Sequence, residues 1–218
     1  MKNIFNLESP MMQLLTKAGD MILLNVMFLI CCIPVITAGA SIAAMHKMMQ
    51  EIVYDTDSGT FKGFFRAFRD NFKQATILWI IILLVILSLG CDALLIITFF
   101  SGSESVKWML ILLAVLVALV CCVAAYMIPL IVRYENTLRQ HLTNAAVRSI
   151  IKLPRTIGLV FMNLLPLILL SISLNAFLQT LIFWVVIGFS FTTYMEVVIL
   201  KPVFAELEGD KENIKIGM

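Results

Sequence analysis

The chain has 218 residues, of which 61% are hydrophobic and 14% are charged, with a formal net charge of +2. A soluble domain carries about a quarter charged residues, so this composition excludes an ordinary soluble globular protein. The small net charge also gives no reason to expect a nucleic-acid partner. At about 20 apolar residues per span, the sequence instead predicts an all-α, polytopic bundle in the lipid bilayer. It forms a single membrane domain over residues 1–218.

The apolar runs predict five transmembrane helices after a mixed polar lead over residues 1–20. The expected spans are 21–44, 75–100, 106–132, 156–173 and 174–200. A signal peptide is the alternative for the first run, because Thr37-Ala-Gly-Ala40 imitates a cleavage site. The acidic as well as basic lead and the length of the run favour a retained span. Few polar residues separate the last two runs, which predicts a tight helical hairpin, with a single broken span as the alternative.

The first span is expected to pack closely against its neighbours. Gly39, Ala40, Ala43 and Ala44 give it a face of small side chains, which lets two helix backbones approach each other. Four polar side chains inside spans are expected to form hydrogen bonds between helices: Asn25, Asn163, Asn175 and Gln179. Both histidines, His46 and His141, fall at the cytoplasmic edge in this scheme, so we expect them to be solvated.

Residues 61–73 between the first two spans predict an amphipathic helix on the cytoplasmic side. Aromatic residues recur at helical spacing beside a basic stripe, which is typical of a helix at the lipid headgroups. A docking surface for a cytoplasmic protein is the alternative. The residues of both readings are Phe61, Phe64, Phe65, Arg66, Phe68, Arg69, Phe72 and Lys73, with Lys62 also in the basic stripe.

Two acidic residues within apolar runs are candidate functional residues, because a carboxylate inside a membrane is costly. Asp92 lies toward the outer end of the second span, and Glu196 lies near the inner end of the fifth, with Lys201 as a possible neighbour. For each, a role in a proton or substrate pathway stands beside a purely structural role in helix packing or at the interface.

The distribution of lysine and arginine predicts the orientation of the spans. The lead carries two of these residues, the four successive loops carry five, one, five and none, and the tail carries three. This alternation predicts an external N-terminus, cytoplasmic first and third loops, and a cytoplasmic C-terminus.

No catalytic, cofactor-binding or metal-binding residues are predicted. The five cysteines lie in apolar runs, without a C-x-x-C motif or a nearby histidine, and are expected to behave as small apolar side chains. No sequence motif of a hydrolase nucleophile or a phosphate-binding loop is present. We therefore expect a protein that is not an enzyme and needs no cofactor.

Two motifs resemble the YesL-like family of bacterial membrane proteins, a family defined by a domain of unknown function. The first is Pro34-Val-Ile-Thr37-Ala-Gly39-Ala40, and the second runs from Phe61 to Phe72 and includes Asn71. The resemblance extends over most of the chain. It implies a location in the bacterial cytoplasmic membrane and an association with uptake of plant-polysaccharide-derived oligosaccharides by ABC importers.

Two functions are compatible with these features. The first is an accessory protein of a carbohydrate ABC import system, which contacts the permease or ATPase subunits through its basic cytoplasmic helices. The segment Asn144–Leu153 in the third loop weakly resembles the coupling loop of ABC importer permeases, although the central glycine of that loop is absent. The alternative is a small secondary transporter that uses Asp92 and Glu196.

Overall fold

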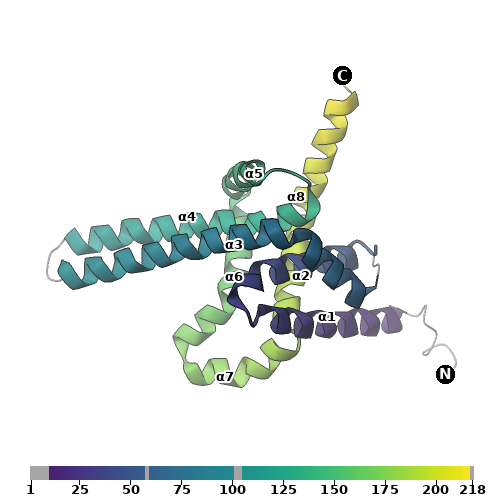
Figure 1. The fold of residues 1–218 in the computed structure, drawn as a ribbon, viewed down its shortest axis with the longest axis horizontal. Coiled ribbons are helices and arrows are strands. Elements are labelled where there is room, and N and C mark those ends of the chain that lie inside the picture. Colours follow the sequence, from purple (N-terminus) through teal and green to yellow (C-terminus); the bar gives the residue numbers. More distant parts are fainter. Residues whose placement is uncertain (1–9, 57–58, 101–104, 217–218) are drawn as a thin grey trace.

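The computed structural model describes residues 10–56, 59–100 and 105–216, and these residues form no strand. The helical class predicted from the sequence is confirmed. The helices are α1 (Pro10–Cys32), α2 (Ala38–Val53), α3 (Thr60–Phe99), α4 (Ser105–Arg133), α5 (Leu138–Ile151), α6 (Leu153–Ile172), α7 (Leu174–Phe183) and α8 (Phe189–Ile216). A 3₁₀ turn (Val35–Thr37) precedes α2, and a π-helical turn (Trp184–Gly188) joins α7 to α8 (Figure 1).

Five segments are long and apolar enough to cross a membrane, so the chain is a multi-pass membrane protein. They are Met11–Cys32, Thr60–Phe99, Ser105–Arg133, Leu153–Ile172 and Phe177–Gly209. Apolar side chains cover much of the outer surface of α3 and α4, which suits contact with lipid. The predicted span 106–132 agrees closely with α4.

The segment expected to form one span over residues 21–44 is divided between two antiparallel helices. α1 ends at Cys32, and α2 then runs back alongside it (Figure 1). Pro34 lacks a backbone N–H and precedes the 3₁₀ turn, where Oγ1 of Thr37 donates to the carbonyl of Cys31 at 2.7 Å. The expectation was wrong because the hydropathy stays high through the turn, and proline is also tolerated inside continuous membrane helices.

The start of α1 lies at the same end of this hairpin as the turn that follows α2. Nζ of Lys17 is 2.7 Å from Oδ1 of Asp55, and Oγ1 of Thr60 donates to Oδ1 of Asp20 at 2.7 Å. The nearby Lys17 ammonium also lowers the pKa of Asp55. The prediction that the lead and the first loop lie at opposite ends of the first helical segment is therefore wrong.

Residues 61–73 are helical, as predicted, but they continue without a break into α3. At 1.5 Å per residue the 40 residues of α3 extend about 60 Å, roughly twice the hydrocarbon thickness of a bilayer. The first part of α3 packs against α1 and α2 and buries Phe64 completely among Met48, Met49 and Leu24. It is therefore part of the bundle and not a separate helix lying flat.

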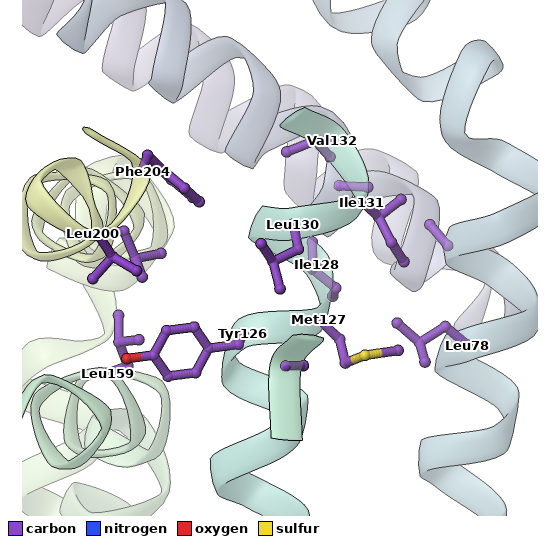
Figure 2. Packing of buried hydrophobic residues seen from close by; sticks show 14 residues of the cluster. Leu78, Tyr126, Met127, Ile128, Leu130, Ile131, Val132, Leu159, Leu200 and Phe204 are labelled. Carbon is purple, nitrogen blue, oxygen red and sulfur yellow. The ribbon is translucent and has the colours of Figure 1, made fainter. Parts of the chain in front are cut away.

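Besides the buried cluster around Phe64, a second cluster of buried apolar side chains lies around α4, which packs against helices on two of its sides (Figure 2). Tyr126 extends toward Leu159 of α6, whereas Met127 extends toward Leu78 of α3 (Figure 2). Side chains on different sides of α4 therefore pack against α3 on one side and against α6 and α8 on the other.

α6 and α7 are joined through the single extended residue Ser173, so the connection is as short as the sequence predicted. The segment expected as one span over residues 174–200 is divided, because α7 crosses to the π-helical turn and only α8 runs back alongside α6 (Figure 1).

Charged side chains bring several segments of the chain into contact at one end of the molecule, opposite the end where α3 finishes at Phe99. The Arg133 guanidinium lies over the rings of Tyr54 and Phe204, at 4.5 and 4.7 Å from their centroids, and its Nη2 is 2.8 Å from Oε1 of Glu208. Nζ of Lys152 is 2.6 Å from Oε2 of Glu206. The turn after α2, the end of α4, the α5–α6 junction and α8 therefore share one end of the molecule, here called the charged end.

Candidate functional site

The buried pair formed by His46 of α2 and Glu196 of α8 is the main candidate site. Nε2 of His46 lies 3.3 Å from Oε2 of Glu196, and the two residues are 4% and 3% exposed. Removing a carboxylate from water costs several kcal/mol unless a partner compensates for it, and here the partner is itself titratable. The pair thus places a carboxylate oxygen and an imidazole nitrogen in contact inside the helical bundle.

The local sequence explains how α2 delivers His46 to the interior. Ala43 and Ala44 leave room for close helix contact, and Gln50, one turn after His46, is also buried. Nε2 of Gln50 donates to the carbonyl of Pro129 in α4 at 3.3 Å. Polar residues on one face of α2 thus contact both α4 and α8.

A cavity of about 150 Å³ adjoins the pair and is bordered by α2, α3, α4, α6 and α8. Its polar lining residues are His46, Trp79, Cys121, Asn163 and Glu196, and the remaining lining residues are largely apolar. Such a volume holds a few water molecules or a solute of a few heavy atoms. The arrangement can bind a small polar group next to the imidazole and carboxylate of the pair.

Nδ1 of His46 is buried and has no hydrogen-bond partner within the described part of the chain. An unsatisfied buried polar atom costs about 1–3 kcal/mol, so its presence calls for a specific reason.

The π-helical turn before α8 is fixed by Asn25 of α1. Nδ2 of Asn25 donates to the carbonyls of Trp184 and Val185 at 3.0 and 2.7 Å, and its Oδ1 accepts from the backbone N–H of Ser190 at 3.0 Å. Widening a helix into a π turn changes the pairing of its backbone groups, and one amide side chain satisfies three of them here. The predicted hydrogen bonding between helices is confirmed for Asn25, whereas Asn163 donates within α6 to the carbonyl of Leu159 at 3.0 Å.

The structure does not bring the two predicted acidic residues together. Asp92 is exposed near the far end of α3, beside a separate, mainly apolar depression between α3 and α4 that includes Phe100 and Met109. Glu196 lies in the bundle interior with His46. Lys201, the neighbour expected for Glu196, instead lies over the ring of Tyr54, with Nζ 5.3 Å from the ring centroid.

The expectation that both histidines are solvated is wrong, because His46 is 4% exposed and His141 is fully buried. His141 lies on the inner face of α5 with Ala145 and Ser149. Burial lowers its pKa, while the backbone of Tyr134 acts in the opposite direction. The helical spacing of His141, Ala145 and Ser149 places them on one face of α5, but it does not by itself show that another helix covers this face.

The aromatic stripe of α3 is divided between the core and the surface. Phe64 is buried and Phe68 is half-buried, whereas Phe61, Phe65 and Phe72 are exposed. The predicted basic partners Arg66, Arg69 and Lys73 are also exposed. Only the outer part of the predicted stripe is therefore available to lipid or to a partner.

The residues of the two YesL-like motifs lie at the α1–α2 turn and in the contact between α2 and α3. Pro34 and Thr37 form the α1–α2 turn described above. Gly39 lies against α3, where an added Cβ would be 2.4 Å from Cβ of Trp79 and 2.6 Å from the carbonyl oxygen of Ala75. Asn71 donates within α3 to the carbonyl of Ala67 at 2.9 Å.

No group of three or more metal-ligating side chains occurs among the residues that the structure describes. The five cysteines are free thiols.

The comparisons with known proteins identify one family and no characterised relative. A family model described as "Protein of unknown function, DUF624" matches residues 21–93. This segment contains the second half of α1, all of α2 and most of α3, including His46 and Gly39. No curated protein and no solved structure matches the chain. The chain is thus similar to DUF624 proteins over its first helical hairpin and the helix that packs against it.

Proposed function

We propose that this membrane protein is a non-enzymatic accessory component of a bacterial carbohydrate ABC import system, in the cytoplasmic membrane, and that it belongs to the YesL-like proteins. The support for the transport system is the sequence resemblance described above. The structural support is the outer surface of α5, at the charged end of the molecule.

α5 is a well-defined helix between two membrane helices. Thr137 begins it with a capping box, in which Oγ1 of Thr137 accepts from the backbone N–H of Gln140 and Oε1 of Gln140 accepts from the N–H of Thr137. Its inner face is buried against α4, yet its outer face exposes large apolar side chains. These are Val147, Ile150 and Ile151, which are 47%, 65% and 61% exposed. A short apolar helix of this kind suits a groove on a partner protein.

The orientation that we propose places the charged end in the cytoplasm. The start of α1, the first loop, α5 and the end of α8 share this end. Among the described lysines and arginines, Lys107 alone lies at the far end of the α3–α4 hairpin. The excess of lysine and arginine near membrane helices marks the cytoplasmic side. α5 is then placed to contact a cytoplasmic ATPase subunit or the cytoplasmic loops of a permease.

Purification of the native complex tests this proposal. A tagged chain, extracted from its own cells in a mild detergent, should carry permease or ATPase subunits of an importer. Ile150→Glu should reduce their recovery because it places a charge on the apolar outer face of α5. Gln13→Glu adds the same charge at an exposed polar position of α1, outside α5, and should leave recovery unchanged. Wild-type protein that carries no transporter subunit would overturn the proposal.

A small secondary transporter remains the second candidate, and the observation that favours it is the His46–Glu196 pair beside a cavity. In this function the pair would exchange a proton as a small solute occupies the cavity. Glu196→Gln should then abolish uptake into vesicles that contain the purified protein, whereas Asp92→Asn should have a smaller effect because Asp92 lies elsewhere. Unchanged uptake in the Asp92→Asn, Glu196→Gln double variant would eliminate this function.

A further inference from the structure

The hydrogen-bond donors that line the cavity beside the buried histidine–glutamate pair are already engaged. Nε1 of Trp79 donates to the carbonyl of Val35 at 2.9 Å, and Nδ2 of Asn163 donates to the carbonyl of Leu159 at 3.0 Å. The thiol of Cys121, which also lines the cavity, is only a weak donor. The groups left to contact a ligand are therefore mainly hydrogen-bond acceptors.

Two of these acceptors belong to side chains of different helices. The amide of Asn163 uses its nitrogen within α6, which leaves Oδ1 to accept a hydrogen bond. Glu196 of α8 contributes a carboxylate, which can accept about four hydrogen bonds. The contact of its Oε2 with Nε2 of His46 at 3.3 Å uses only part of this capacity.

α4 adds a backbone acceptor to the same cavity. Pro129 lies within α4 and has no backbone N–H, so the carbonyl of Ala125, four residues earlier, lacks its usual helical partner. Both residues line the cavity, and a step of four residues stays on one side of a helix. At membrane depth, a backbone group freed in this way is tolerated where it is buried in protein or lines a cavity. The carbonyl of Ala125 is therefore a further acceptor for a ligand.

The charge of the lining favours a cation. The described residues that line the cavity include one carboxylate, that of Glu196, and no lysine or arginine. A neutral imidazole of His46 carries its proton on Nε2, the nitrogen that faces the carboxylate, so Glu196 keeps its full negative charge. A buried charge is costly unless an opposite charge lies beside it, and a cationic ligand would supply that charge.

The remainder of the lining suits an organic cation better than a metal ion. Ile42, Ile82 and Leu164 are apolar, and Trp79 adds an aromatic side chain. An aromatic ring attracts a cation, and apolar side chains can cover a hydrocarbon group but cannot replace the water around a metal ion. The volume of about 150 Å³ limits the ligand to a few heavy atoms.

We propose that this cavity binds a small primary alkylammonium ion, such as ethylammonium. The three N–H groups of its ammonium donate to the carboxylate of Glu196, to Oδ1 of Asn163 and to the carbonyl of Ala125. The short alkyl group lies against Ile42 and Trp79. The proposal deepens the second candidate function and rests on the same site, but it requires binding alone and not transport.

The test measures the binding of ethylammonium to the purified protein in detergent, by calorimetric titration and by the shift in unfolding temperature. Ethylammonium chloride should bind and raise the unfolding temperature relative to sodium chloride at the same ionic strength. Ethanol has no charge, and tetramethylammonium has the charge but no N–H donor, so both should bind much more weakly.

The first pair of variants tests the carboxylate. Glu196→Gln keeps the shape of the side chain but removes its charge. It should weaken ethylammonium binding about tenfold or more, the factor expected for a hydrogen bond to a charged group. Asp92→Asn makes the matched change at an exposed carboxylate outside the cavity and should leave the affinity unchanged.

The second pair tests the backbone acceptor. Pro129→Ala restores a backbone N–H that can occupy the carbonyl of Ala125, so it should weaken binding about fivefold. Pro166→Ala restores an N–H within α6, outside the lining, and should leave the affinity unchanged. If Glu196→Gln does not fold, the two proline variants decide the question.

Three results would overturn the proposal. They are unchanged affinity in folded Glu196→Gln, equal affinity of Pro129→Ala and Pro166→Ala, and binding of tetramethylammonium or sodium as tight as that of ethylammonium. Ethylammonium binding without uptake into vesicles would support the proposal and eliminate the transporter. A protein that binds no ethylammonium would overturn the proposal and leave the accessory role to be decided by purification of the complex.

Discussion

Nζ of Lys17 lies 2.7 Å from Oδ1 of Asp55, which holds the beginning of α1 beside the turn between α2 and α3. The contact between Asp20 and Thr60 places the same two segments together at a second point. α1 and α2 therefore leave and return to one end of the molecule. This relationship changes the predicted topology more than any other contact, because it brings the lead to the same end as the first loop.

Cysteine labelling tests this arrangement. In a variant without the native cysteines, single cysteines at Met11 and Thr56 should react with a membrane-impermeant maleimide from the same side of the membrane, because both positions are exposed at the charged end. A cysteine at Ser105, at the far end of the α3–α4 hairpin, should react from the opposite side. Labelling of Met11 and Thr56 from opposite sides would contradict the hairpin.

The contact between Gly39 and α3 predicts a strong effect of one methyl group. In Gly39→Ala the new Cβ would overlap Cβ of Trp79 and the backbone oxygen of Ala75, neither of which can move independently of its helix. Overpacking of this kind costs about 1–3 kcal/mol, so the unfolding temperature in detergent should fall.

Gly90→Ala is the matched control in α3, because no neighbouring atom lies within 4 Å of its added Cβ. Alanine is favoured over glycine within helices by up to about 1 kcal/mol, so this variant should be as stable as the wild type or more so. Equal losses of stability in both variants would show that Gly39 is not a packing contact.

Asn25→Leu should destabilise the protein by about 2–4 kcal/mol, because it leaves buried backbone groups of the π-helical turn without their partner. Thermal unfolding in detergent measures this loss. Asn175→Leu in α7 changes an exposed asparagine and should alter the free energy of unfolding by less than about 0.5 kcal/mol. A stable Asn25→Leu variant would mean that the turn persists without the amide.

The buried His141 predicts a loss of stability at acidic pH. Burial lowers its pKa in the folded state, so the unfolded chain binds a proton first as the pH falls. The stabilisation is therefore fully present above the unfolded pKa of about 6.5 and decreases as the pH falls below it, down to the lowered pKa of the folded state. Unfolding temperatures measured between pH 5 and pH 8 should show this slope.

His141→Gln should reduce the pH dependence of stability in this range, while His46→Gln provides the comparison with the other histidine. A slope that is unchanged in His141→Gln would assign the effect to other groups.

Several features followed from the sequence because they depend on local composition. A backbone in lipid must satisfy its own hydrogen bonds, so long apolar runs become helices, and α4 and most of α3 lie where hydropathy places them. Small residues around Gly39 predicted close packing, and the structure shows which helix they face. The polar side chain of Asn25 predicted a bond between helices, but not that its partner would be a π-helical turn.

The sequence by itself therefore determined that this chain is a helical membrane protein and which segments are apolar enough to span. Only the tertiary structure decided that the first of these segments turns back at Pro34, that His46 meets Glu196, and that Asp92 lies apart from both. The free energy of transferring a helix into lipid is a sum over its own residues, so the sequence is enough to estimate it. Contact between two side chains depends instead on how helices far apart in the sequence pack together. A buried histidine and a solvated one have the same local sequence signal until the helix that covers them is known.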